Sequence, residues 1–330
     1  MSTTKTSDLP ASSIPIFRDL AQLREWRNEA FREGKSVGFV PTMGALHEGH
    51  LSLVRRSLSE NDHTIISIFV NPAQFAPHED LDSYPRTLSQ DLEVLEKESV
   101  DNKSTSAVFL PTVDVMYPSS SQDPRKQGTF VEVAGLGEVM EGASRPTFFR
   151  GVATVVTKLF NAVQPSHAYF GQKDIQQALI LRRMVGDLLF AYPTPSTLHI
   201  VPTARAKDHL ALSSRNTYLN EVERKFANTL HKALKYARRA WEEGESKGKA
   251  INAALDVIGA EKIIAKKNRV NIGLDYVEMN DSSTLDVIGS SETKHSLSKD
   301  DPLILSGAIW VGKTRLIDNI LLGDSSRILY

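Results

Sequence analysis

Cysteine is absent from the 330-residue sequence, which excludes disulfide bonds and thiolate metal sites and favours a reducing compartment. The sequence also lacks a charge surplus, with 39 Lys and Arg side chains and 40 Asp and Glu side chains. This balance disfavours a nucleic-acid binder, because such proteins usually carry a basic surplus. No apolar run, TIISIFV included, approaches the about 20 residues that a membrane helix needs. Residues 1–13 lack both the apolar region of a secretory signal and the arginines of a transit peptide. These absences predict a cytoplasmic protein with neither membrane nor nucleic-acid partners.

Up to about residue 203 the sequence alternates β-branched runs with amphipathic runs. Strands are predicted at residues 36–42, 63–71, 106–112, 130–135, 167–174 (a strand and turn) and 198–208. Helices are predicted at residues 19–34, 43–61, 89–98, 150–163 and 175–189, with a strand as the alternative for residues 150–163. Strands joined by crossover helices predict an α/β fold with a parallel sheet covered by helices.

From residue 204 the pattern changes. A long charged helix is predicted at 221–246 and a second at 253–267, followed by short strands at 274–280 and 303–312. We therefore predict three parts: a loose N-terminal tail (1–13), an α/β part (14–203) and a smaller C-terminal α+β domain (204–330).

Residues 43–50 (MGALHEGH) follow the first long strand, and ligands of open parallel sheets bind beyond the carboxyl ends of strands. Gly44 lets the backbone approach a ligand, and a helix start offers N–H groups to an anion. His47 and His50 share a helix face, and protonated imidazoles donate hydrogen bonds to phosphate. Three interpretations stay open here: phosphate binding, a metal pair that lacks a third protein ligand, and a helix cap with one core histidine.

Three further segments place polar side chains near strand ends or at the domain junction. Asn71 and Gln74 are amides that suit a small hydroxylated carboxylate, with an ordinary Asn-Pro turn as the alternative. Lys173, with Gln177 one helical turn further on, suits a phosphate, although a lone lysine is more often a surface residue. Arg215 follows two serines and can bind phosphate bidentately, although Ser-Ser-Arg also occurs in helix caps.

Seven motifs stand in a fixed order from about residue 17 to 322: FVPTMGALHEGHLSLV, SIFVNPAQF, DLDSYPRTLSQDL, SRPTFFRGVATVVTKLFN, FGQKDIQQ, LALSSRN and GKTRLIDNILL. Together they resemble the pantothenate synthetase (pantoate–β-alanine ligase) family. The H-x-G-H element alone marks only the wider nucleotidyltransferase superfamily, whereas its combination with FVNPAQF and GQKDIQQ is specific.

The resemblance implies an ATP-dependent, AMP-forming ligase of coenzyme A precursor biosynthesis. The pantoate carboxylate attacks the α-phosphorus of ATP and gives pantoyl adenylate and pyrophosphate, and the amine of β-alanine then displaces AMP. The family has a catalytic domain with a Rossmann-like parallel sheet and helices on both faces, which the resemblance places at residues 14–203. Its smaller C-terminal domain, expected at residues 204–330, closes as a lid, and the family is usually a homodimer. Two rivals remain: a cytidylyl- or adenylyltransferase that keeps the nucleotide on its product, and a non-catalytic nucleotide-binding module.

The resemblance also assigns roles to residues. The expected ATP-binding residues fall in three segments: Met43, Gly44, His47 and His50; Gly171, Lys173 and Asp174; Leu212, Ser213, Ser214 and Arg215. Ala204 is a further expected ATP-binding position, outside these segments. The expected catalytic residues are His50, His47, Lys173 and Arg215. The expected pantoate and β-alanine residues are Gln74, Gln177 and Asn71. Mg²⁺ is expected near Asp91, through water.

Three positions depart from the family pattern. Phe148 stands where the family usually has histidine, so any role of that side chain is absent here. Ala204 stands where a valine commonly offers its backbone to adenine, and such backbone contacts survive the change. Gln90 replaces a frequent acidic residue before Asp91, which weakens the metal assignment.

A second nucleotide motif lies at residues 307–314 (GAIWVGKT), which match the P-loop spacing G-x-x-x-x-G-K-[ST]. A phosphate-cradling loop needs small residues between its glycines, but Ile309, Trp310 and Val311 fill that space and predict a buried strand. Only a short helix-like segment is expected after it, without the strand and Asp that hold Mg²⁺ in P-loop proteins. We therefore predict that this match binds no nucleotide.

Overall fold

The computed structural model describes residues 9–76, 79–119, 123–297 and 302–330. The chain forms two compact units. Unit 1 comprises Met1–Glu132, Thr147–Tyr169 and Met184–Leu198. Unit 2 comprises Val133–Pro146, Phe170–Arg183 and His199–Tyr330. The two units interleave along the sequence, and the boundary at residue 203 stays a prediction.

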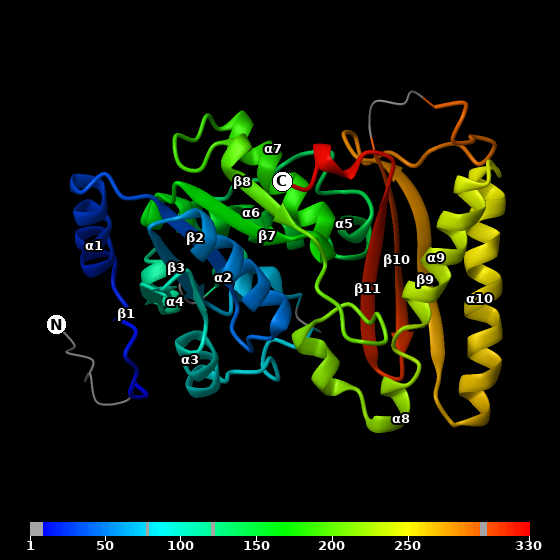
Figure 1. Cartoon of the computed structure of the whole chain (residues 1–330), viewed down its shortest axis with the longest axis horizontal. Coiled ribbons are helices and arrows are strands. Elements are labelled where there is room, and N and C mark those ends of the chain that lie inside the picture. The colour runs from blue at the N-terminus through cyan, green and yellow to red at the C-terminus, as the bar shows by residue number, and fades with distance from the viewer. Residues whose placement is uncertain (1–8, 77–78, 120–122, 298–301) are drawn as a thin grey trace. The chain divides into compact units, whose positions relative to one another are not determined.

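A six-stranded parallel sheet confirms the α/β prediction (Figure 1). Its strands are β1 (Ile16–Phe17), β2 (Val37–Thr42), β3 (His63–Ile68), β6 (Ala107–Phe109), β7 (His167–Gly171) and β8 (Leu198–Val201). They lie in the order β1-β6-β3-β2-β7-β8. The order reverses at β2, so the loop after β2 lies at the topological switch point, where such sheets bind ligands.

Crossover connections set which face of the sheet each helix covers. The helices concerned are α1 (Leu20–Arg32), α2 (Glu48–Glu60), α3 (Leu88–Glu96) and α6 (Phe148–Val163). Helix α2 joins β2 to β3 and α3 joins β3 to β6, so both connections run along the sheet in one direction. Helix α1 joins β1 to β2 and α6 leads to β7, so these connections run in the opposite direction. Because parallel crossovers are right-handed, α1 and α6 cover one face and α2 and α3 the other. The packing of α1 against α6 agrees with this arrangement.

Unit 2 contains a three-stranded antiparallel sheet of β9 (Ile272–Asp281), β10 (Leu303–Val311) and β11 (Thr314–Leu322). Helices α9 (Thr229–Glu242) and α10 (Lys247–Lys267) lie side by side along it (Figure 1). Their apolar faces bury Leu234, Trp241 and Ile258 against strand residues such as Leu305 and Ile309. This confirms the predicted smaller α+β part.

The remaining elements are short, apart from α7. They are β4 (Ser99–Val100), β5 (Lys103–Ser104), α4 (Val113–Met116), α5 (Glu141–Ser144), α7 (Ile175–Asp187) and α8 (Glu221–Arg224), with 3-10 turns at Pro72–Gln74, Gln172–Asp174, Pro195–Thr197, Ser214–Tyr218 and Ser325–Arg327. In the described part of the predicted tail, Ser12 and Ser13 both donate hydrogen bonds to the Glu96 carboxylate. Residues 1–8 of that tail lie outside the described residues.

Three secondary-structure predictions are wrong. Residues 130–135 form no strand, because the Val131 N–H bonds to the Thr154 hydroxyl and the chain then turns. The predicted helix 221–246 is broken between α8 and α9, where Asn228 instead donates to the Asp208 carbonyl. The segment after Gly312, predicted to be helix-like, is strand β11, paired with β10 along its whole length.

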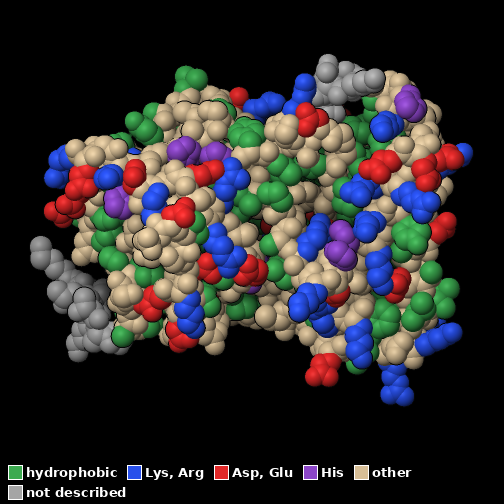
Figure 2. All heavy atoms as spheres, viewed as in Figure 1, with side chains coloured by type: hydrophobic (Ala, Val, Ile, Leu, Met, Phe, Trp, Pro, Cys, Tyr) green, Lys and Arg blue, Asp and Glu red, His purple; other side chains and the backbone are tan. Residues whose placement is uncertain are grey.

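The surface carries both signs of charge. Figure 2 shows Lys and Arg side chains interspersed with Asp and Glu over the face in view, consistent with the net charge of −1. Among the described residues, every helix is too short or too polar to cross a bilayer.

Candidate active site

The loop after β2 is held by a buried carboxylate. Asp91, 2% exposed on α3, accepts hydrogen bonds from the Ala45 N–H at 3.0 Å and the Leu46 N–H at 2.8 Å. Gly44 has φ +84°, and a Cβ there would meet the Asp91 carboxylate at 3.1 Å. The loop therefore runs close over the carboxylate in a conformation that favours glycine.

His47 and His50 cap helix α2. The Nδ1 of His47 accepts from the Gly49 N–H at 3.1 Å, and the Nδ1 of His50 accepts from the His47 N–H at 3.4 Å. Their ring centroids lie 4.1 Å apart. With each Nδ1 acting as an acceptor, the proton of a neutral ring lies on Nε2. The helix cap is thus confirmed, whereas the core histidine expected with it is wrong, because both rings are only partly buried. The cap is compatible with phosphate binding because the two contacts use different nitrogens.

Among the described residues, no group of three or more His, Asp or Glu side chains is placed to hold a metal ion. Both Asp91 oxygens already accept protein hydrogen bonds, including one from the Thr87 hydroxyl at 3.1 Å. Burial raises the pKa of Asp91, although these hydrogen bonds act in the opposite direction. The donor set therefore does not fit a metal held by the protein alone. It fits an ion that keeps its waters and takes most of its ligands from a bound phosphate.

A second group in unit 1 surrounds the turn after β3. Asn71, 1% exposed, donates from Nδ2 to the Gln74 Oε1 at 2.9 Å and to the Gly151 carbonyl at 3.2 Å. Its Oδ1 accepts from the Tyr117 hydroxyl at 2.7 Å. Burial raises the pKa of Tyr117, so this hydroxyl stays a neutral donor. Asn71 and Gln74 are therefore brought together, with Asn71 as the anchor of the turn.

In unit 2, Gly171, Lys173 and Asp174 occupy one turn at the end of β7. The Lys173 ammonium lies 3.4 Å from the Asp174 carboxylate. Gln177 is partly exposed on α7 in the next turn, whereas its neighbour Gln176 is buried and donates to the Leu136 and Val139 carbonyls. Of the two adjacent glutamines, the sequence-predicted one is thus the more accessible.

The segment from Ala204 to Arg215 folds back on itself. The Leu212 N–H donates to the Ala204 carbonyl at 3.0 Å, which brings the expected ATP-binding position Ala204 next to the first residue of the third expected ATP segment. Ser213 caps the following turn by accepting from the Arg215 N–H at 3.3 Å. Ser214 opens that turn, and its carbonyl accepts from the Thr217 hydroxyl.

The P-loop match is a β-hairpin. Val311 pairs with Thr314, so Gly312 and Lys313 are the two residues of the connecting turn. Gly312 has φ +60°, and a Cβ there would overlap the Glu223 carboxylate. The segment between the two glycines of the motif lies in β10 and pairs on both sides, so the predicted strand is confirmed. Its predicted burial holds for Ile309 and Val311 but is wrong for Trp310, which is 42% exposed.

Several side chains that shape these segments were missed by sequence reasoning. Tyr117 and Thr87 in unit 1 contact the predicted residues Asn71 and Asp91, and Asn319 in unit 2 contacts the Lys173 carbonyl. Gln172, next to Lys173, bonds to Asn319, and Arg205, next to Ala204, bonds to Asp318. Thr87, Gln172, Asp318 and Asn319 lie in the quoted motifs, such as RLIDN and FGQKD, whereas Tyr117 and Arg205 lie outside them.

Comparison with known proteins gives a consistent result. The family model described as "Pantoate-beta-alanine ligase" matches residues 15–321. A pantothenate synthetase of Thermosipho melanesiensis is 46% identical over 310 residues, covering 94% of this chain and 100% of that protein. One of Moorella thermoacetica is 45% identical over 309 residues, covering 94% and 99%.

Solved structures agree. The crystal structure of pantothenate synthetase from Thermus thermophilus is 39% identical with a TM-score of 0.76, covering 93% of this chain and 99% of that one. The pantoate-beta-alanine ligase of Francisella tularensis, complexed with beta-gamma ATP and beta-alanine, is 30% identical with a TM-score of 0.68, covering 94% and 98%.

Proposed function

Because the chain belongs to the pantoate-beta-alanine ligase family, we propose that the residues described above carry out pantothenate synthesis in two steps. The enzyme condenses pantoate with β-alanine at the expense of ATP, through pantoyl adenylate, and releases pyrophosphate and AMP. A carboxylate is a poor electrophile, and AMP supplies the leaving group. The observation that carries this conclusion is the family match along residues 15–321.

The phosphates of ATP are the proposed ligands of the capped histidines. The Nδ1 atoms of His47 and His50 accept from backbone N–H groups, so the Nε2–H of a neutral ring is the donor that we assign to the phosphates. Lys173 supplies a positive charge and Arg215 a guanidinium for bidentate contact. Fixed donors of this kind stabilise charge that develops at the α-phosphate, because they need no reorganisation during the reaction.

The backbone supplies the remaining ATP contacts in this proposal. These residues are Met43, Gly44, Gly171, Ala204, Leu212, Ser213 and Ser214, with Asp174 directed to the ribose. The conformation of Gly44 and the folded-back segment from Ala204 to Leu212 support it, since both bring main-chain groups into fixed positions.

Pantoate and β-alanine are the proposed ligands of Gln74, Gln177 and Asn71. The Asn71 amide is fully engaged with Tyr117, Gln74 and Gly151, so its part is to hold Gln74 in place beside the substrate. Neutral amides fit this task, because they offer a donor and an acceptor to hydroxyl and carboxylate groups without adding charge.

Mg²⁺ accompanies ATP in this proposal, and Asp91 reaches it through water. One carboxylate with phosphate oxygens and waters is a common magnesium environment. The ion would neutralise phosphate charge. In this proposal Asp91 also keeps the loop in place, whether the ion is bound or not.

The test is a stopped assay of AMP formation with pantoate, β-alanine, ATP and Mg²⁺. AMP release that requires both acids supports the proposal, whereas a stable nucleotidylated product points to a nucleotidyltransferase. Lys173→Ala is expected to lower adenylate formation by orders of magnitude while leaving the circular dichroism spectrum unchanged. Chelation by EDTA is expected to stop the reaction reversibly. Near-normal turnover of Lys173→Ala would refute the role of Lys173.

The wider setting is also a proposal. Residues 14–203 form the catalytic domain, 204–330 the smaller C-terminal domain and 1–13 a tail. The enzyme is a cytoplasmic homodimer. Sedimentation velocity measures the assembly directly, and a monomer at working concentration would contradict it.

A further inference from the structure

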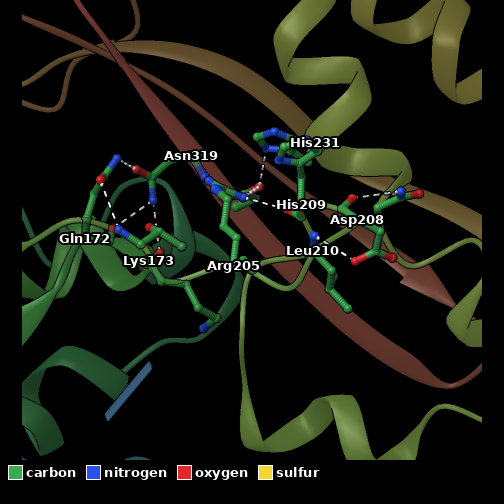
Figure 3. A network of polar contacts seen from close by, with 12 residues as sticks. Gln172, Lys173, Arg205, Asp208, His209, Leu210, His231 and Asn319 are labelled. Atoms are coloured by element: carbon green, nitrogen blue, oxygen red, sulfur yellow. Dashed lines mark hydrogen bonds and ion pairs between the residues drawn. The ribbon is translucent and has the colours of Figure 1, made fainter. Parts of the chain in front are cut away.

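Two consecutive side chains of β11 hold two different segments of unit 2 (Figure 3). Successive side chains of a strand point to opposite faces of its sheet. Asn319 contacts the turn that carries Lys173, and Asp318 contacts Arg205 and His231. Both side chains are buried, with exposed fractions of 2% and 4%.

Asn319 uses its whole amide group on that turn. Its Nδ2 donates to the Gln172 carbonyl at 2.9 Å and to the Lys173 carbonyl at 3.0 Å. Its Oδ1 accepts from the Gln172 side-chain Nε2 at 3.0 Å. The turn is a single three-residue 3-10 turn without a side-chain cap of its own. A residue 146 positions away in sequence therefore fixes the backbone from which the Lys173 side chain extends.

Gln172 also connects this turn to the chain at Thr203. Its Oε1 accepts from the Thr203 N–H at 3.3 Å, directly before the segment that begins at Ala204. On the other face of β11, Asp318 accepts two hydrogen bonds from Arg205, at 2.7 and 2.8 Å. The strand thus sets the spacing between the Lys173 turn and the 204–215 segment, both within unit 2.

We propose that Asn319 is a positioning residue for the adenylation step: it holds the Lys173 turn in the geometry in which the ammonium meets the phosphates of ATP. This inference rests on the proposed role of Lys173 as a phosphate ligand. Misplacement of a catalytic group by about 1 Å can cost about 100-fold in rate, and an unanchored single turn allows such a displacement.

The test compares Asn319→Asp with a matched control, Asn280→Asp. Asn280 is a 1% exposed amide on β9 of the same sheet, which β10 separates from β11, and its Nδ2 also donates to a backbone carbonyl, that of Leu285. Both variants lose stability for the same reason. We expect only Asn319→Asp to slow pantoyl adenylate formation at saturating ATP by about 10- to 100-fold. Asn280→Asp is expected to remain within about twofold of wild type at a temperature where both are folded.

Equal rates in the two variants, at equal loss of thermal midpoint, would overturn the proposal. Should Asn319→Asp not fold, Asn319→Ala and Asn280→Ala replace the pair, because alanine adds no charge beside the carbonyls.

A double-mutant cycle with Lys173→Ala shows whether Asn319 acts through the lysine. We expect Asn319→Asp to slow the Lys173→Ala enzyme by less than about twofold, since the group to be positioned is gone. If Asn319→Asp slows the Lys173→Ala enzyme by as much as it slows the wild-type enzyme, the proposal is contradicted. If Lys173→Ala alone is near normal, the proposed role of Lys173 fails and this inference fails with it. If Lys173→Ala is slow and Asn319→Asp is not, only the positioning role is refuted.

Discussion

His47 illustrates how one imidazole can serve the fold and the chemistry at once. Its Nδ1 caps α2 by accepting from the Gly49 N–H, and its Nε2 is the proposed phosphate donor. Asparagine is among the best N-cap residues and lacks the second nitrogen, whereas alanine loses the cap and costs about 1 kcal/mol. The two functions of the ring can therefore be separated by substitution.

We expect His47→Asn to keep wild-type stability but to form pantoyl adenylate at least about 10-fold more slowly. His47→Ala is expected to lose both stability and activity. Urea unfolding and the pyrophosphate-release assay measure the two quantities on the same preparations. Full activity of His47→Asn would show that Nε2 makes no contact in the reaction.

At the scale of elements, the contact between helix α6 and the turn Pro72–Gln74 supports the proposed substrate amides. A Cβ on Gly151 would overlap the Ala73 carbonyl oxygen, which is backbone and cannot rotate away. The Gly151 carbonyl also accepts from Asn71. The absence of a side chain at this position thus allows the helix to approach the turn closely.

Gly151→Ala is expected to push α6 off this turn. Overpacking of this kind costs about 1–3 kcal/mol. Because Gln74 is a proposed pantoate ligand, KM for pantoate should rise more than KM for ATP. Gly186→Ala is the control, since a Cβ there meets only Pro195, at 3.5 Å, an ordinary contact. An equal rise of both KM values would argue against a specific effect on the turn.

The long helices and strands could be predicted from the local sequence pattern, and each wrong secondary-structure prediction has an identifiable physical reason. The runs around β2, β3 and α6 are strongly apolar and periodic, so their type was predictable. Residues 130–135 have a strand-like sequence without a strand partner, and β11 is a strand because β10 pairs with it. The family motifs indicated Lys173 as a site residue. The contact of Asn319 with the Lys173 carbonyl could not be predicted in this way, because local periodicity contains no information on residues 146 positions apart.

At the scale of the whole molecule, stability in acid should depend on Asp318. Burial alone would raise the pKa of its carboxyl, but hydrogen bonds from His231 and Arg205 outweigh burial and hold the pKa below its ordinary value. A depressed folded-state pKa means that this stabilisation is fully present above the unfolded-state value, about 3.9, and is lost as pH falls through the folded-state value.

We expect Asp318→Asn to lower the free energy of unfolding by about 3 kcal/mol at pH 7, because Arg205 is left largely buried without its partner. The difference from wild type should shrink as pH falls below about 4. Asp208→Asn is the control: its ion pair with Arg224 is more than a third exposed on both sides and should contribute less than about 1 kcal/mol. Urea titrations at several pH values test both, and a difference that does not vary with pH would contradict the assignment.

The link between Asn319 and Gln172 also has a consequence for biosynthesis. The two residues are 147 positions apart, and a ribosome adding about 5–20 residues per second needs roughly 7–30 s to pass from one to the other. Until Asn319 has been added, the Lys173 turn lacks its anchor. A nascent chain in which the parallel sheet is complete but β11 is not yet synthesised is therefore expected to be inactive. The proposed phosphate-binding turn reaches its final geometry only after β11 has been synthesised and has paired with β10.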